Sequence, residues 1–354
     1  MMAGNRADLA IVAMDLSEEA QARGWDAFVM AHPRGTPFHR TAWLTGVAVA
    51  TANPCHALAA VGPSGRIVGL LPLHHVQSRI FGQALVSSAF AVDGGILADD
   101  PAVIAMLAHA AQDLARDKGD LPVELHGGPG PEGWEGYSEH VTFARPLAAD
   151  DEAELKAVPR KHRAELRKAL ANDALHIRIG RDERLIRDHY RVYSESVRNL
   201  GTPVFPVRLL REILDRFGED ADIIVVYERE RPVSAVLSLY HGGAVMPYWG
   251  GGIHDARRLR SNELVYYRLM GHARARGMTM FDFGRSKLGS GQASWKKSFG
   301  FEPQPLLYHT WNAAGRARDI DPRSAKYQRR IDLWKKLPLP VANLIGPWIS
   351  RGLG

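Results

Sequence analysis

One local pattern occurs twice along the chain, and this repeat constrains the fold more than any other feature. In each half, two apolar runs joined by a short turn precede a glycine-containing loop, a helical pattern, a glycine and another short apolar run. The corresponding glycines keep a nearly constant offset: Gly119 and Gly277 are 158 residues apart, and Gly95 and Gly252 are 157 apart. A solenoid needs more repeats with a shorter period. The repeat therefore predicts two similar lobes.

Each copy combines strands and helices in the same order. Turns near 63–65 and 228–231 separate pairs of apolar runs and predict two hairpins. Helical patterns follow at 102–118 and 263–276, and each ends at a glycine, which is a common helix stop signal. We therefore predict an α/β protein with two tandem lobes, each a mixed sheet flanked by helices.

The boundaries follow from the repeat and from a change in composition near the end of the chain. We expect an N-terminal lobe at 1–148, a C-terminal lobe with the active site at 149–320, and a basic and apolar tail at 321–354. A chain of 354 residues is long for a single core, so two domains are the natural expectation.

Composition excludes several other classes of protein. Hydrophobic residues make up 45% and charged residues 24% of the chain, which is typical of a globular protein. No run of 18 apolar residues occurs, and Cys55 is the only cysteine, so we expect a cytoplasmic protein without disulfides. His74 and His75 are adjacent and point to opposite faces of a strand, which makes a poor chelate. No metal site is predicted.

The segment 247–301 carries most of the chemistry. It runs from an apolar strand into three glycines, a basic loop and a helix, then a second strand, a Gly/Ser loop and a lysine pair. Backbone N–H groups at a helix N-terminus bind anions, and arginines add charge. We therefore predict a binding site for a phosphate-bearing donor, with Ser261 and Asn262 as N-cap candidates. The predicted donor-binding residues are Gly251, Gly252, Arg257, Arg260, Ser261 and Asn262.

A second basic segment lies between the lobes. Arg160, Arg163 and Arg167 share one stripe of a predicted helix, VPRKHRAELRKALAND. Arginine forks bind phosphate or carboxylate, so these three residues are predicted to bind an anionic substrate. The alternative is a solvated surface helix. The net charge of +6 also favours an acidic partner.

The order of motifs in 247–301, from the triple glycine to FDFG and WKKSFG, resembles the last conserved stretch of the FemAB-like acyltransferases. These belong to the GCN5-related N-acyltransferase (GNAT) superfamily. The segments PFHRTAWL and FAVDGGILADD also resemble that family, and the likeness extends over roughly 36–301. Among its members, the chain looks most like those associated with exosortase A/PEP-CTERM and exopolysaccharide loci. The resemblance implies two tandem GNAT-like lobes.

The resemblance also implies a reaction, the transfer of an acyl or aminoacyl group to an amine on a cell-envelope or exopolysaccharide precursor. Acyl-CoA or aminoacyl-tRNA would be the co-substrate, with no permanently bound cofactor. The chain lacks the Arg/Gln-x-x-Gly-x-Gly/Ala loop that acyl-CoA enzymes of the superfamily carry, so both donors stay open. The acceptor would be an anionic small molecule or a lipid-linked precursor; tRNA is a further possible partner, and DNA is not expected.

Two residues are candidates for catalysis. Asp282 ends an apolar strand, where its carboxylate can accept the proton of the attacking amine; alternatively, it bonds the following glycine turn. Lys296 aligns with a lysine of the family's FK-x-x-FG motif. Arg285 replaces a glycine of many relatives, and Tyr248 and Trp249 precede the triple glycine. These last three are predicted to bind substrate, with core packing as the alternative for the two aromatic residues.

The tail 326–354 combines basic residues with tryptophans and branched apolar residues. Tryptophan beside lysine suits a lipid–water boundary, so the tail predicts peripheral contact with the inner face of the cytoplasmic membrane. The alternative is a tail that packs on the lobes and buries its tryptophans. For the whole chain, the alternative to an enzyme is a non-catalytic protein of the same fold that recognises an anionic glycan, a lipid precursor or RNA.

Overall fold

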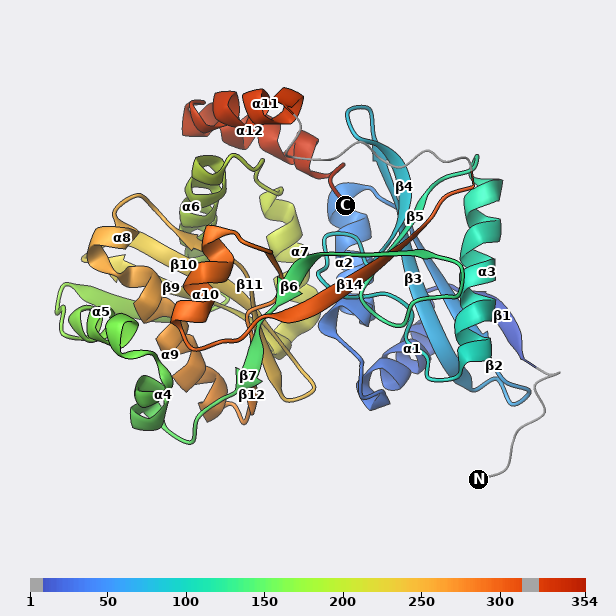
Figure 1. Cartoon of the computed structure of the whole chain (residues 1–354), viewed down its shortest axis with the longest axis horizontal. Coiled ribbons are helices and arrows are strands. Elements are labelled where there is room, and N and C mark those ends of the chain that lie inside the picture. The colour runs from blue at the N-terminus through green and yellow to red at the C-terminus, as the bar shows by residue number, and fades with distance from the viewer. Residues whose placement is uncertain (1–8, 314–324) are drawn as a thin grey trace. The chain divides into compact units, whose positions relative to one another are not determined.

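The computed structural model describes residues 9–313 and 325–354, and these form two compact units (Figure 1). Unit 1 comprises 9–138, 307–313 and 351–354, and unit 2 comprises 139–306 and 325–350. Two of the boundaries fall within strands, β6 (Glu135–Thr142) and β14 (Gln304–Trp311), and another lies between residues 350 and 351. The predicted boundary after residue 148 stays a prediction, and the one at 320/321 lies outside the described residues.

Unit 1 has one mixed sheet with helices on both faces. Its strands follow the order β1-β2-β3-β4-β5-β14, and only β4 and β5 are parallel. The elements are β1 (Ala10–Met14), α1 (Glu19–Ala31), the 3-10 helix η2 (Pro37–His39), α2 (Thr41–Thr51), β2 (Cys55–Val61), β3 (Ile67–Ser78), β4 (Gly82–Ser87), α3 (Pro101–Asp117) and β5 (Val123–His126).

Strand alternation divides the core of unit 1 between the two faces of its sheet. Leu71 and Leu73 of β3 pack with Leu107 of α3 in one apolar cluster. On the other face, His74 is fully buried, and its Nε2 lies 3.0 Å from the carbonyl oxygen of Leu44 in α2. Burial lowers the pKa of His74 to about 4. A buried, neutral histidine with backbone partners is part of the core.

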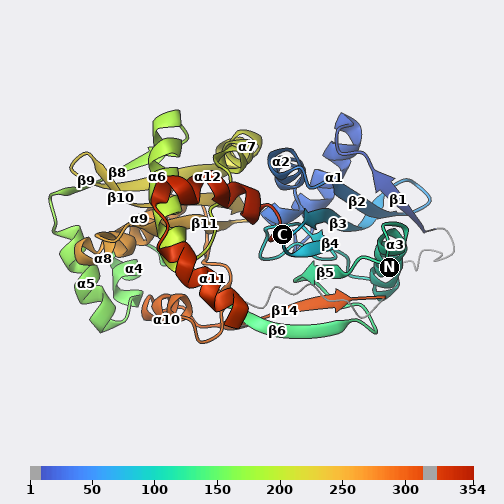
Figure 2. The ribbon, with the colours of Figure 1, turned by 90° about the horizontal axis from the view of Figure 1, so that it is seen from above.

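Unit 2 repeats this plan with the sheet order β7-β12-β11-β10-β9-β8. Helices α6 and α7 cover one face, and α9 covers the other (Figure 2). The elements are β7 (Ala144–Pro146), α4 (Asp151–Ala157), α5 (Arg160–Leu170), β8 (Leu175–Gly180), α6 (Glu183–Leu200), α7 (Val207–Phe217), the 3-10 helix η3 (Gly218–Asp220), β9 (Ala221–Glu228), β10 (Arg231–His241), β11 (Ala244–Gly252), α8 (Ala256–Leu259), α9 (Ser261–Ala275), β12 (Met280–Asp282), β13 (Ser286–Lys287), α10 (Gly291–Ser298), α11 (Ala325–Lys335) and α12 (Leu339–Ser350).

The two units confirm the predicted fold class. In unit 1 the antiparallel strands β2, β3 and β4 lead through α3 to the parallel strand β5. In unit 2 the antiparallel strands β9, β10 and β11 lead through α9 to the parallel strand β12. Both predicted hairpin turns lie between paired strands, and both predicted helices are present within two residues of the expected bounds.

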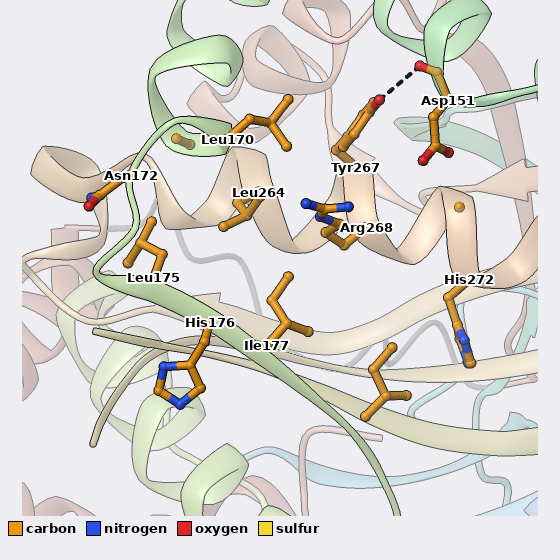
Figure 3. A pocket seen from close by; sticks show the side chains of 13 residues that line it. Asp151, Leu170, Asn172, Leu175, His176, Ile177, Leu264, Tyr267, Arg268 and His272 are labelled. Atoms are coloured by element: carbon orange, nitrogen blue, oxygen red, sulfur yellow. Dashed lines mark hydrogen bonds between the residues drawn. The ribbon is translucent and has the colours of Figure 1, made fainter. Parts of the chain in front are cut away.

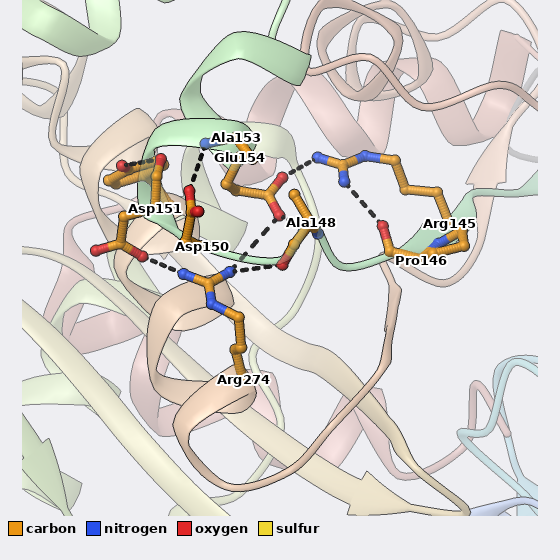
Figure 4. A network of polar contacts seen from close by, with 9 residues as sticks. Arg145, Pro146, Ala148, Asp150, Asp151, Ala153, Glu154 and Arg274 are labelled. Carbon is orange, nitrogen blue, oxygen red and sulfur yellow. Dashed lines mark hydrogen bonds and ion pairs between the residues drawn. The ribbon is translucent and has the colours of Figure 1, made fainter.

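A buried ion-pair network fixes β7 and α4 to α9 within unit 2 (Figure 4). The fully buried Glu154 carboxylate accepts hydrogen bonds from the guanidinium of Arg145 and, at 2.9 Å, from the backbone N–H of Ala148. Arg274 of α9 pairs with Asp151 and donates to the carbonyl oxygen of Ala148 at 3.3 Å. The network satisfies a charge that is otherwise expensive to bury.

Removing this carboxylate should destabilise unit 2. Glu154→Ala leaves the mostly buried Arg145 guanidinium without its anion, and we expect a loss of about 3 kcal/mol or more in the free energy of unfolding. Urea denaturation measures it. Glu152→Ala is the matched control, because Glu152 lies on the same helix in an exposed pair with Lys156 and should leave stability unchanged. Equal stability of both variants would show that the network contributes nothing.

Candidate functional site

The parallel strands β11 and β12 pair over only two residues and then separate. Ala244 is opposite Met280, and Val245 is opposite Phe281; β12 ends one residue later, while β11 continues to Gly252. The carboxyl end of a strand beside such a separation is a usual place for ligands in open α/β sheets. Asp282 occupies this end of β12.

Only one oxygen of the Asp282 carboxylate accepts hydrogen bonds from the described residues around it. Its Oδ1 accepts from the backbone N–H of Gly284 at 2.8 Å and from the hydroxyl of Thr142 at 3.2 Å. Within the described part of the chain, no group donates a hydrogen bond to Oδ2. Burial raises the pKa of Asp282 above its usual value, although both hydrogen bonds and the nearby Lys296 oppose the rise. The residue thus bonds the glycine turn and still presents one oxygen with unused lone pairs.

Lys296 binds the turn that follows Asp282. Its ammonium donates to three consecutive carbonyl oxygens: those of Phe283 at 2.8 Å, Gly284 at 3.0 Å and Arg285 at 3.1 Å. The side chain is 9% exposed, and its Nζ lies 5.4 Å from the ring centre of Phe143. Burial lowers the pKa of Lys296 to about 8, with the positive charge of Arg285 adding to the effect and Asp282 opposing it. Asp282 and Lys296 are therefore both hydrogen-bonded to the same turn.

Aromatic side chains pack around Phe283, the first residue of this turn. Phe283 makes edge contacts with Tyr266 of α9 at 5.1 Å, with Trp295 of α10 at 5.7 Å and with Phe301 at 4.6 Å between ring centres. Such contacts fix the relative positions of the rings. These ring contacts connect the turn to α9 and to α10, the helix that carries Lys296.

The predicted donor loop has a packing role that the sequence did not reveal. A Cβ on Gly251 would come within 2.2 Å of the Ser196 hydroxyl of α6, and a Cβ on Gly252 within 2.6 Å of Asn262 Oδ1. These glycines let α6 and α9 approach β11. They stay predicted donor-binding residues through their backbone atoms alone.

The predicted N-cap is wrong. Helix α9 begins at Ser261, and its N-cap is Arg260, whose φ of 57° is in the left-handed region. The Ser261 hydroxyl lies 2.6 Å from that of Ser234, which also donates to Asn262 Oδ1 at 2.8 Å. Ser261 and Asn262 thus attach α9 to β10 instead of capping it, because both lie inside the helix, where the buried Ser234 hydroxyl is their partner.

Two of the three arginines in the basic loop are engaged in ion pairs. Arg260 pairs with Glu165 of α5, and Arg258 pairs with Glu228 at 3.2 Å. Arg257 is exposed, and no described residue forms an ion pair or a side-chain hydrogen bond with it. Of the predicted arginines Arg257 and Arg260, Arg257 is therefore the more available to a ligand.

Helix α5 connects the basic loop with α10. Besides the Glu165 pair, His162 contacts the ring of Phe299 at 4.7 Å, and its Nδ1 lies 3.3 Å from the Ser298 hydroxyl. The predicted substrate-binding arginines differ in availability. Arg163 donates to the carbonyl oxygen of Val158 at 3.1 Å, which bonds it to the start of its own helix. Arg160 and Arg167 are exposed.

The remaining predicted residues lie on β11 and in the turn. Trp249 is 5% exposed, so the core-packing alternative fits its side chain, whereas Tyr248 is half-buried at a bulge in β11. The Trp249 carbonyl oxygen lies 2.7 Å from Nε2 of His189, a fully buried residue of α6. Arg285 supplies one of the carbonyls that bind Lys296. Sequence reasoning missed His189 and Thr142, whose positions depend on contacts across the sheet.

A hollow of about 480 Å³ lies elsewhere in unit 2, between β8, α5 and α9 (Figure 3). Ile177 and Leu264 line it together with Tyr267, Arg268 and His272. It contains none of the predicted catalytic or donor-binding residues, so the reaction is not assigned to it. Within the described residues, no three His, Cys, Asp or Glu side chains are grouped to hold a metal ion.

The core of unit 2 matches a known protein family. Residues 156–297 match the acetyltransferase (GNAT) domain. The match covers less than half of the chain, so it applies to this segment, the GNAT domain, and not to the whole protein. It contains α5, the separating strands β11 and β12, Asp282 and Lys296. The match supports acyltransferase chemistry of the GNAT type. No curated protein matches the chain in sequence.

Solved structures share the fold over most of the chain. FemX matches 85% of this chain and 96% of its own, at 15% identity and a TM-score of 0.66. A tandem GNAT protein from the clavulanic acid biosynthesis pathway matches 88% of this chain and 100% of its own, at 12% identity and a TM-score of 0.55. L-PGS from Bacillus licheniformis matches 93% and 97%, at 15% identity and a TM-score of 0.51. At these identities the likeness shows the tandem fold.

The burial of Lys296 in the GNAT domain predicts a pH dependence of stability. Its pKa is about 8 in the folded protein, against an ordinary value of 10.5. Between these values the unfolded chain binds more protons than the folded protein, so stability rises with pH. Relative to Lys296→Met, the wild type should gain about 3 kcal/mol in the free energy of unfolding between pH 8 and 10.5. Below pH 7 the difference between the two should be constant. Urea denaturation of both proteins across this range measures it, and a constant difference throughout would contradict the lowered pKa.

Proposed function

We propose that the chain is an N-acyltransferase whose reaction centre lies in the GNAT domain at Asp282. The observation that carries the proposal is the unbonded Oδ2 of this carboxylate, at the point where β11 and β12 separate. In the proposed reaction the amine attacks the acyl carbonyl, and Oδ2 accepts the proton that the amine loses. The carbon–nitrogen bond forms and the carbon–sulfur or carbon–oxygen bond to the donor breaks. The proton held by Asp282 then passes, directly or through water, to the departing sulfur of CoA or ribose oxygen of tRNA. Burial favours this role because it raises the pKa of Asp282 toward neutral pH.

The two units differ at this position, which favours unit 2 as the catalytic unit. In unit 1 the parallel pairs are Leu85 with Val123 and Val86 with Glu124, so the residue corresponding to Asp282 is Leu125. Leu125 is fully buried in the apolar core and cannot accept a proton.

Lys296 has a positioning role in this proposal. Its ammonium donates to three backbone carbonyls, so it holds the turn that orients Asp282. The exposed Arg257, Arg160 and Arg167 are proposed to bind the anionic parts of the donor and of the acceptor. The donor is acyl-CoA or aminoacyl-tRNA.

For the acceptor we propose an amine on a cell-envelope or exopolysaccharide precursor of a PEP-CTERM/exosortase-type system. The sequence resemblance to the FemAB-like proteins supports it. So does the fold of a putative lysylphosphatidylglycerol synthetase C-terminal domain from Agrobacterium fabrum, with a TM-score of 0.54 at 14% identity over 83% of this chain and 92% of that one. The name of that protein refers to an aminoacylated lipid.

Asp282→Asn tests the proposed base. The amide oxygen can still accept from Gly284 and Thr142, so the turn should persist, but the amide cannot take up the proton of the amine. We expect kcat to fall about 100-fold or more. Mass spectrometry of the purified protein first identifies co-purifying CoA or tRNA, and turnover is then measured with that donor. Asp173→Asn, an exposed carboxylate change in the same unit, should retain full activity.

A non-catalytic binding protein of the same fold is the alternative. It predicts that the wild-type protein binds CoA or tRNA without turnover and that Asp282→Asn leaves this binding unchanged. Turnover by the wild type that depends on Asp282 excludes the alternative. Equal turnover by both proteins would instead remove Asp282 from the mechanism.

The exposed arginines of α5 provide a separate prediction. Arg160→Ala/Arg167→Ala should raise KM about tenfold and leave kcat unchanged, because both residues would bind the substrate equally in the ground and transition states. Steady-state kinetics with varied acceptor measures it. Arg208→Ala/Arg216→Ala removes two arginines from the surface helix α7 and should change neither constant. A KM equal to that of the control would make α5 a solvated surface helix.

A further inference from the structure

The C-terminal helices α11 and α12 pack on α6 through small and polar residues (Figures 1 and 2). In α12, Ala342 is 2% exposed and Gly346 is buried against Val204, whose carbonyl oxygen accepts from the Ser350 hydroxyl at 2.9 Å. Asn343 donates to the Ser194 hydroxyl at 3.3 Å. The inward stripe of α12 is thus built from side chains that allow a close approach.

The turn between the two helices is also fixed to unit 2. Arg198 of α6 donates to the carbonyl oxygens of Lys335 at 3.3 Å and Leu337 at 3.4 Å. Trp334 is 8% exposed, so one tryptophan of the tail is buried, as the packing alternative from the sequence required. The described part of the tail is therefore a folded pair of helices held on α6.

The outward stripe of α12 is the apolar one. Leu344 is 79% exposed and Trp348 is 52% exposed; Val341 and Ile345 are exposed on the same stripe. The spacing i, i+3, i+4, i+7 places all four on one face of the helix. A surface helix of a globular protein normally buries its large apolar residues and exposes its small or polar ones. Helix α12 does the reverse, and large exposed apolar patches mark interaction sites.

The segment that precedes this apolar stripe in the sequence is rich in basic residues. Between residues 328 and 350 the chain has four basic side chains and a single acidic one, Asp332. The basic residues are Arg329, Arg330, Lys335 and Lys336, and all four are exposed. A cationic segment beside an exposed tryptophan and leucine complements the surface of an anionic bilayer.

We propose that α11 and α12 form a docking surface for an anionic phospholipid bilayer, on which α12 lies flat. Leu344, Trp348, Val341 and Ile345 enter the boundary between headgroups and acyl chains, and the four basic residues bind the headgroups. None of the described helices is long and apolar enough to cross a bilayer, so the contact is peripheral. The small inward stripe keeps α12 attached to α6 while its outer face is in lipid. The proposal is independent of the reaction assigned to Asp282.

Point substitutions test the surface better than truncation, because cutting the chain before Trp334 removes a buried anchor and can unfold α11. Leu344→Glu/Trp348→Glu changes two exposed side chains and should leave the melting temperature of the full chain unchanged. Co-sedimentation is measured with vesicles of phosphatidylglycerol and phosphatidylcholine, and with vesicles of phosphatidylcholine alone. We expect the wild type to bind the anionic vesicles and the double variant to bind at least about tenfold more weakly. Met30→Glu, at an apolar residue of similar exposure on α1, should bind like the wild type.

Three results would overturn the proposal. The first is that the wild type binds no vesicles, and the second is that wild type and double variant bind equally. The third concerns a second copy of the chain. If light scattering shows that the wild type is a dimer and that Leu344→Glu/Trp348→Glu is a monomer, the apolar stripe is a protein interface.

Discussion

The ammonium of Lys296 is the interaction on which the candidate site depends. Three consecutive carbonyl oxygens point at one nitrogen, so the backbone of 283–285 has a fixed curvature immediately after β12. Burying an ammonium is costly unless it is well bonded, and here the backbone supplies the bonds. No carboxylate is within ion-pair distance of Lys296 in the described structure, so Asp282 is not neutralised by it directly. Lys296 thus holds the turn without forming an ion pair with Asp282, and Oδ2 of Asp282 accepts no hydrogen bond from the described residues.

The overall fold could be predicted from the sequence because it depends on local patterns. Hairpin turns, helical periodicity and stop glycines each act over a few residues, and their repetition gave the two lobes before any contact was known. Gly277 illustrates this: its φ of 79° ends α9 where the sequence placed the end.

Side-chain partners could not be predicted in the same way, because they come from distant parts of the chain. Ser261 was expected to cap a helix, but it lies inside α9, and its hydroxyl is 2.6 Å from that of Ser234 on β10. Arg260 was expected to face a ligand, and Glu165 lies on another helix. Lys296 was identified through a motif, whereas its three carbonyl partners follow from the packing of α10 against the turn. The sequence could identify these residues as functional candidates, but it could not predict which groups they contact.

The division of β14 between the units has a consequence for biosynthesis. Unit 1 needs β14 as the neighbour of β5, with Tyr308 opposite His126, and β14 is near the end of the chain. The N-terminal unit therefore cannot complete its sheet while the ribosome is still translating the GNAT domain. During that interval β5 has one edge without its final partner, and an open strand edge can pair with another chain. Unit 2, whose sheet strands are contiguous in sequence from β7 to β12, can form its sheet first. The order of synthesis and the order of folding are thus expected to be opposite for the two units.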